Sequence, residues 1–287
     1  PSYPVDGYVF NGHLRDMGTN APGMHPLSLT KTGTGTQTLV GNVIAYSGAT
    51  TLSQGRLILR NTTTAFDSLL TTISSGTVLE FNTSASGNTQ QLNALGQTIT
   101  GTGVLEKTGP GQLWFGGNGL PVFISMGSGG LIDVKEGILR NEFANGNWSA
   151  NLADMNIASG ATVNVWDANI TVDGLTGSGT VDKGQANTHV LTVGVDNQAN
   201  ATFDGVIRNS LGTLAFTKTG TGTQTLTGTN LYTGSTTVSG GKLQLDFATG
   251  GTSNIISPSS AVVMGGGTLE IKGGSGESNA QTFNGIS

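Results

Sequence analysis

The sequence predicts an all-β protein, a single right-handed parallel β-helix (β-solenoid) with Gly-rich corners that forms one domain over residues 1–287. Three observations support this fold class. Long blocks of sequence recur, short apolar runs alternate with polar residues, and Gly supplies 47 of the 287 residues, about twice its usual share. No stretch shows the sustained 3.6-residue periodicity of a helix, so we expect strands and tight corners throughout.

The recurrence is strongest near the two ends of the sequence. Residues 30–39 (TKTGTGTQTL) reappear unchanged at 217–226, and the blocks that follow them, 46–59 and 232–245, align with eight of 14 residues identical. Ten identical residues in the same order do not arise by chance. Self-similarity of this kind is the signature of a repeat architecture.

Each repeat reads as short strands joined by turns. Apolar and polar residues alternate at 56–59, 162–165 and 242–245, which is the two-residue period of a half-buried strand. A module that recurs with insertions and with sequence divergence between its copies favours an open stack of coils over a closed sandwich. We expect coils of roughly 20 to 27 residues, wound right-handed like nearly all parallel β crossovers.

The repeat also divides the chain. The predicted modules span 10–82, 95–165, 170–202 (short and degenerate) and 203–271, with 281–287 as the start of a further module.

Composition excludes several classes of function. Charged residues make up 10% of the chain, and 12 Lys+Arg against 17 Asp+Glu leave a net charge of −5. Without a basic stripe we expect no nucleic acid partner. The absence of Cys excludes disulfides, thiolate metal sites and thiol nucleophiles. No apolar run approaches the ~20 residues of a membrane helix, so we expect no membrane span in this segment.

The sequence predicts no catalytic, cofactor-binding or metal-ligating residue. The three histidines are scattered without metal-ligand spacing: His13, His25 and His189. Three Asp-Gly steps fit turns better than calcium loops, because the nonapeptide of calcium-binding β-rolls is absent: Asp6, Asp173 and Asp204.

Charged residues are dispersed along the chain. The densest group is Asp133, Lys135 and Glu136 beside Arg140 and Glu142, which we interpret as a solvated strand face. Four lysines share one phase of the repeat, and we expect them to be solvated, with their stems lying over a neighbouring coil: Lys31, Lys107, Lys183 and Lys218.

Thr occupies every second position over 30–38 and over 217–229. Such spacing predicts hydroxyls along one strand face, which would suit a carbohydrate or ice surface. The same pattern also arises because Thr is a good solvent-facing strand residue.

These blocks carry a family resemblance. Residues 29–39, 46–51 and 55–57, together with the copy at 214–245, resemble the passenger-associated repeat of bacterial autotransporters, also called the autotransporter-associated β-strand repeat. The resemblance implies a right-handed parallel β-helix exported to the bacterial surface, often as a stalk or adhesin. It implies no catalytic residues.

We therefore expect a mature or excised segment of a non-catalytic extracellular structural protein. It would act as a surface stalk, an adhesin passenger, or a filament or matrix subunit. Phe-Asn-Gly recurs in one phase of the repeat at 10–12 and 283–285, which favours head-to-tail self-association into filaments. Surface polysaccharide is a further expected partner.

Two alternatives remain open. A carbohydrate-active β-helix enzyme, a polysaccharide lyase or hydrolase, predicts acidic and basic residues within about 10 Å in one groove. A Thr-ladder module that binds carbohydrate or ice predicts a flat, regular Thr face.

Overall fold

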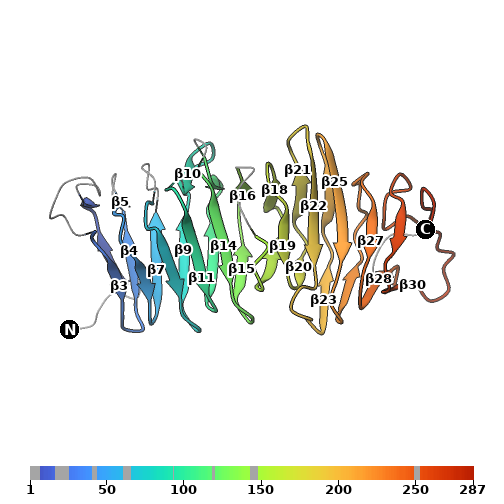
Figure 1. The fold of residues 1–287 in the computed structure, drawn as a ribbon, viewed down its shortest axis with the longest axis horizontal. Helices are drawn as coiled ribbons and strands as arrows, with labels where there is room; N and C mark the ends of the chain where they lie inside the picture. Colours follow the sequence, from blue (N-terminus) through green and yellow to red (C-terminus); the bar gives the residue numbers. More distant parts are fainter. Residues whose placement is uncertain are drawn as a thin grey trace.

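The computed structural model describes residues 7–16, 26–40, 44–60, 66–92, 94–117, 120–142, 148–248 and 253–287. These residues form 30 strands and no helix. The strands follow one another in chain order along an elongated stack, from the N-terminal end to the C-terminal end (Figure 1). Among the described residues, no helix is long and apolar enough to cross a membrane.

One sheet runs the whole length of the stack, and we call it sheet 1. Its twelve strands are, in order, β1 (Tyr8–Phe10), β4 (Thr36–Leu39), β7 (Arg56–Arg60), β9 (Val78–Asn82), β12 (Val104–Thr108), β15 (Leu131–Val134), β17 (Asp154–Ile157), β20 (Leu175–Gly177), β23 (Asn200–Phe203), β26 (Thr223–Leu226), β28 (Lys242–Asp246) and β30 (Thr268–Lys272).

A second side of the coil is sheet 2, with strands β10 (Thr89–Leu92), β13 (Gln112–Phe115), β16 (Ile138–Asn141), β18 (Thr162–Val165), β21 (Thr180–Lys183) and β24 (Val206–Asn209). A short pair, β2 (Leu14–Arg15) and β5 (Ile44–Ala45), lies nearer the N-terminal end.

The third side consists of two sheets. Sheet 3 holds β3 (Leu29–Lys31), β6 (Thr50–Leu52), β8 (Leu70–Ile73), β11 (Gln97–Gly101) and β14 (Val122–Met126). Sheet 4 holds β19 (Ile170–Val172), β22 (Thr188–Val193), β25 (Thr213–Lys218), β27 (Thr236–Val238) and β29 (Val262–Met264). Residues 151–153 join the two sheets, because Leu152 N–H donates to Met126 O and Asp173 N–H donates to Ala153 O.

Every pairing between these strands is parallel, as predicted for a β-solenoid. Coil length varies along sheet 1: Gln224 pairs with Leu243 across a short coil, and Tyr8 pairs with Gln37 across a long one. These lengths lie close to the expected range of roughly 20 to 27 residues. The right hand of the coil stays a prediction.

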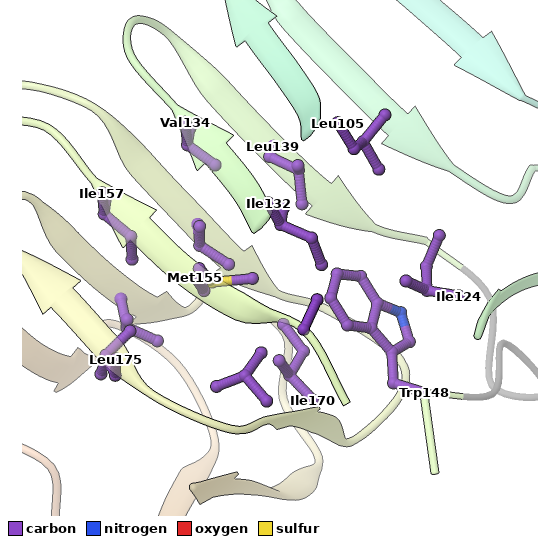
Figure 2. Close-up of a cluster of buried hydrophobic side chains, with 14 of the residues drawn as sticks. Leu105, Ile124, Ile132, Val134, Leu139, Trp148, Met155, Ile157, Ile170 and Leu175 are labelled. Carbon is purple, nitrogen blue, oxygen red and sulfur yellow. The ribbon is translucent and has the colours of Figure 1, made fainter. Parts of the chain in front are cut away.

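The core is a set of apolar columns that follow the stack. On sheet 1, Leu57, Leu79, Leu105, Ile132 and Met155 pair in register and are all buried. Figure 2 shows three of them (Leu105, Ile132 and Met155) in one cluster with side chains from the other sides of the coil. Burying each such side chain stabilises the fold by about 1.5–3 kcal/mol, so each coil depends on its neighbours for its core.

Buried hydroxyls explain part of the recurring Tyr-x-Gly-x-Thr block. Tyr232 Oη, Thr236 Oγ1 and Ser260 Oγ form a chain with contacts of 2.7 and 2.9 Å, and Ser260 donates to Gly234 O. The same chain in the first copy joins Tyr46, Thr50, Ser68 and Gly48. The hydroxyls satisfy one another inside an apolar core, which stabilises the fold around this block.

The glycine of that block sits against the preceding coil. Gly234 N–H donates to Leu214 O at 3.0 Å, and a Cβ at position 234 would lie 2.4 Å from the same oxygen. Any side chain there would push the two coils apart.

The identical Thr-Gln-Thr-Leu blocks place a glutamine toward the core. Strands β20 and β23 share a single ladder pair, Gly177 with Phe203. Gln224 completes the hydrogen bonding there: its Nε2 donates to Leu175 O at 2.9 Å, and its Oε1 accepts from Leu175 N–H at 3.1 Å. In the first copy, Gln37 Nε2 donates to Tyr8 O.

Lys107, Lys183 and Lys218 are buried, so the prediction of solvated charges is wrong for these three lysines, whereas Lys31 is partly exposed. Each of the four lies at or one residue before the end of a strand, in an inward column, and three of them are at most 1% exposed: Lys107, Lys183 and Lys218. They also lie on different sides of the coil, in sheets 3, 1, 2 and 4 for Lys31, Lys107, Lys183 and Lys218 respectively.

The buried ammonium groups satisfy backbone carbonyls at the corners. Lys107 Nζ donates to Thr108 O and Gly109 O at 2.7 Å and to Glu136 O of the next coil at 3.1 Å. Lys31 Nζ makes the equivalent contacts with Thr32, Gly33 and Gln54. A positive-φ glycine turns the chain there (φ 75° at Gly109), and the ammonium supplies three donors to the carbonyls around it.

We expect Gly234→Ala to lower the free energy of unfolding by about 2–3 kcal/mol, because the new methyl group overlaps a fixed backbone oxygen. The matched control is Gly35→Ala, where a Cβ would meet nothing within 4 Å and φ is not in the left-handed region. That control should change stability by less than about 1 kcal/mol. Urea unfolding followed by circular dichroism measures both, and equal effects would contradict the packing argument.

The lysine corners predict a specific pH dependence. Burial lowers the pKa of Lys107 to about 8, partly offset by the charge of Glu136. At pH values between this pKa and the ordinary pKa near 10.5, the unfolded chain binds more protons than the folded chain. The free energy of unfolding of the wild type therefore rises with pH over this range. The free energy of unfolding of Lys107→Met should not rise with pH in this way. At neutral pH it should be about 1–3 kcal/mol lower than that of the wild type, because the carbonyls that Lys107 binds lose their donor.

The measurement is the difference in unfolding free energy between the wild type and Lys107→Met at several pH values from neutral to strongly alkaline. A difference that stays flat over this range, or that shrinks as pH rises, would count against a buried ammonium at position 107.

Candidate functional site

Charged side chains form a row on the outer face of sheet 1. Arg56 Nη1 lies 2.6 Å from Glu80 Oε2 and 2.5 Å from Glu106 Oε1. Lys135 Nζ lies 2.6 Å from Glu106 Oε2 and 3.6 Å from Asp133 Oδ2. Glu80, Glu106 and Asp133 are register partners on consecutive strands, so carboxylates dispersed in sequence are adjacent in space.

This row corrects one interpretation of the sequence. Asp133 is 8% exposed and belongs to a paired network, so it is not part of a solvated face. Its sequence neighbours Arg140 and Glu142 lie elsewhere, on and beside sheet 2. Sequence proximity grouped these five residues, whereas the register of parallel strands decides which of them meet.

The row borders an open surface cavity of about 460 Å³. Its lining combines the charged residues with apolar and hydroxyl groups: Val9, Thr36, Thr38, Arg56, Ile58, Arg60 and Glu80. Such a hollow can hold a small polar group, and its guanidinium and carboxylate groups can donate and accept hydrogen bonds.

The protonation of Glu106 follows from its neighbours. Burial alone would raise the pKa of this carboxyl, but hydrogen bonds and charges from Arg56 and Lys135 bring it below its ordinary value. Glu106 is therefore ionised at neutral pH. A carboxylate in this state can act as a base or nucleophile, but it is a poor general acid.

Arg140 belongs to a separate cluster on sheet 2. Its Cζ lies 4.4 Å from the centroid of the Trp114 ring and 3.3 Å from that of Trp166, and its Nε forms an ion pair with Glu142. Stacking of a guanidinium on two indoles on neighbouring coils stabilises the stack. This cluster joins coils and makes no contact with the sheet 1 row in the described structure.

Threonines form a second row, on the third side of the coil. Thr30, Thr51, Thr72 and Thr100 are register partners through sheet 3, followed by Ser125. Thr171, Thr192, Thr217 and Thr237 are register partners through sheet 4. We call these nine residues the hydroxyl column.

The column runs along the stack rather than along a strand. The prediction that residues 30–38 set their hydroxyls on one strand face is wrong, because the chain turns a corner between Lys31 and Thr36. Thr30 belongs to sheet 3, whereas Thr36 and Thr38 belong to sheet 1. A sequence signal for the true column exists, because Thr30, Thr51 and Thr72 are evenly spaced along the chain and Thr171 and Thr192 repeat that spacing.

The other residues singled out in the sequence do not converge. His13 lies between β1 and β2, His189 lies in β22, and His25 falls outside the described residues. Within the described part of the chain, no group of three His, Cys, Asp or Glu residues could hold a metal ion.

Two of the three Asp-Gly steps bind the next coil. Asp173 Oδ1 accepts from the N–H groups of Asp196 and Gln198 at 2.7 and 3.1 Å, and Asp204 Oδ1 accepts from Thr227 Oγ1. Asp6 falls outside the described residues.

Comparison with known proteins adds a family. The profile of the passenger-associated-transport-repeat matches residues 29–59 and 216–245. Each match contains the lysine corner, the inward glutamine and the Tyr–Thr pair of the buried hydroxyl chain described above. No curated protein and no solved structure matches the chain. Repeats of this family imply secretion to the outer membrane or cell surface. The chain is thus a parallel β-solenoid in which two segments, 29–59 and 216–245, are similar to the passenger-associated-transport-repeat.

Proposed function

We propose that this chain is a non-catalytic extracellular structural protein, a β-helical rod that serves as a surface stalk or adhesin passenger. The observation that carries the proposal is the single sheet of twelve parallel strands running through the whole described chain. Strands about 4.8 Å apart give a rod on the order of 55 Å long. A continuous apolar core makes such a rod stiff, which suits it to hold other groups away from a surface.

The two ends of the stack support head-to-tail assembly into filaments. β1 is the first strand of sheet 1, and its Tyr8, Val9 and Phe10 are 58%, 61% and 40% exposed. β30 is the last strand, with Ile271 51% exposed. Apolar, exposed strand edges are templates for pairing with a further strand, and a non-identical pair of ends gives an open, heterologous contact.

Sedimentation velocity and electron microscopy at increasing protein concentration test this function. We expect rods that lengthen by end-to-end contact, and we expect Val9→Lys combined with Ile271→Lys to keep them single. The matched control is Leu95→Lys, which changes a leucine that is even more exposed (71%) and lies outside the strands. A compact particle would reject the rod, and a strictly monomeric rod at high concentration would reject the filament.

A carbohydrate-active enzyme is the second candidate, favoured by the sheet 1 row. Glu80 and Glu106 each place an oxygen on the same Arg56 nitrogen, so these oxygens are at most about 5.1 Å apart. Carboxyl groups about 5–5.5 Å apart occur in retaining glycoside hydrolases. The lowered pKa of Glu106 and the arginine between the two carboxyls weigh against this candidate.

Incubation with neutral and acidic polysaccharides, followed by assays for new reducing ends and for unsaturated products, separates the two functions. The structural proposal predicts no product. Product formation that Glu106→Gln abolishes, while the control Glu270→Gln on the same sheet does not, would establish the enzyme and refute the structural proposal. Glu270 forms an ion pair with Lys242 near the C-terminal end of the stack, away from the cavity.

A further inference from the structure

We propose that the hydroxyl column binds a neutral, hydroxyl-rich polysaccharide that lies along the axis of the stack. This inference goes beyond the structural function, because it gives one side of the rod a ligand. It rests on three properties of the outer face of sheets 3 and 4, namely the regular spacing of its hydroxyls, the absence of charged residues from the hydroxyl column and the outward column beside it, and its uneven surface.

The first property is spacing. Register pairing places one hydroxyl on each successive strand from β3 to β14, and again from β19 to β27, about 4.8 Å from the next. The coil that contains Leu152 separates the two runs. Thr100 Oγ1 donates to Ser125 O at 3.0 Å. Each of the other Thr hydroxyls in the column can donate one hydrogen bond to a ligand and accept others, and the β-branched side chain has few rotamers. A polymer with repeated hydroxyls can therefore meet the column at several points with little loss of side-chain entropy.

The second property is charge. All the ion pairs in the described structure belong to the sheet 1 and sheet 2 sides of the coil. The hydroxyl column and the outward column beside it carry no charged residue; the described residues of that second column include Leu70, Thr98, Phe123, Val190 and Ala215. A neutral face on a chain of net charge −5 is complementary to a neutral polymer and repels an acidic one.

The third property is the uneven shape of the face. In the second column Leu70 is 44% exposed. Phe123 is half-buried and lies two strands further along, with Thr98 between the two residues in register. These bulky side chains break the flatness that an ice surface requires. They also offer apolar contact to the faces of sugar rings next to the hydroxyls. The uneven shape thus favours a polysaccharide over ice.

Retention on insoluble cellulose and chitin, both neutral, tests the proposal, with insoluble polygalacturonate as the acidic comparison. We expect retention on at least one neutral polymer, little on the acidic one, and little dependence on salt. Thr51→Val, Thr72→Val, Thr192→Val and Thr217→Val together should weaken retention at least about tenfold, since four hydroxyls are lost while shape is kept.

The matched control is Thr162→Val with Thr180→Val, which removes two half-buried, register-paired hydroxyls from the outer face of sheet 2. It should bind like the wild type. Thr72→Lys is a second variant that places a charge in the column without removing the other hydroxyls, and it should also weaken retention. Circular dichroism and melting temperature verify that each variant is folded.

The proposal is overturned by no retention on either neutral polymer, by equal retention of the fourfold variant, or by an equal loss in the control. Inhibition of ice growth without retention on cellulose or chitin would assign the face to ice instead. None of these results bears on the rod or filament, which sedimentation and microscopy test separately.

Discussion

The structure depends on parallel backbone hydrogen bonding between coils of unequal length. Each strand satisfies its N–H and C=O groups with the coils before and after it, so register, rather than sequence distance, determines which side chains meet. Coils on sheet 1 differ in length, yet leucine meets leucine in the core and glutamate meets glutamate outside it. The corners absorb the differences in length, while the strands keep the columns aligned.

Corners are where such a ladder is hardest to complete, and polar side chains inside the coil complete it. Lys107 binds three carbonyls, Gln224 binds both backbone groups of Leu175, and Ser260 binds Gly234 O. Burying polar groups without partners would lower the stability of the fold. Each of these side chains is therefore required wherever the sequence forms the corner whose backbone groups it binds. This pairing explains why the two matched repeats keep lysine, glutamine and threonine as faithfully as their apolar residues.

Much of the fold is predictable from the sequence, because alternation, glycine corners and repetition are local signals. The all-β class, parallel stacking and coil length all follow from them. The burial of Lys107 could not be predicted, because Lys107 lies just before a corner, and only the pairing with the next coil shows that its side chain points inward and also meets Glu136 O. The sheet 1 row was missed for the same reason: Glu80 and Glu106 lie a whole coil apart along the chain, and nothing local in the sequence aligns them.

The lysine corners also affect how such a rod survives outside the cell. A trypsin-like protease must draw a lysine side chain into its own pocket and hold the flanking segment extended. At Lys107, Lys183 and Lys218 the side chain points into the coil and its ammonium group is bound to backbone carbonyls. Cleavage at these positions requires local unfolding of at least one coil. Placing these three lysines inside therefore removes three entry points for digestion from the folded rod.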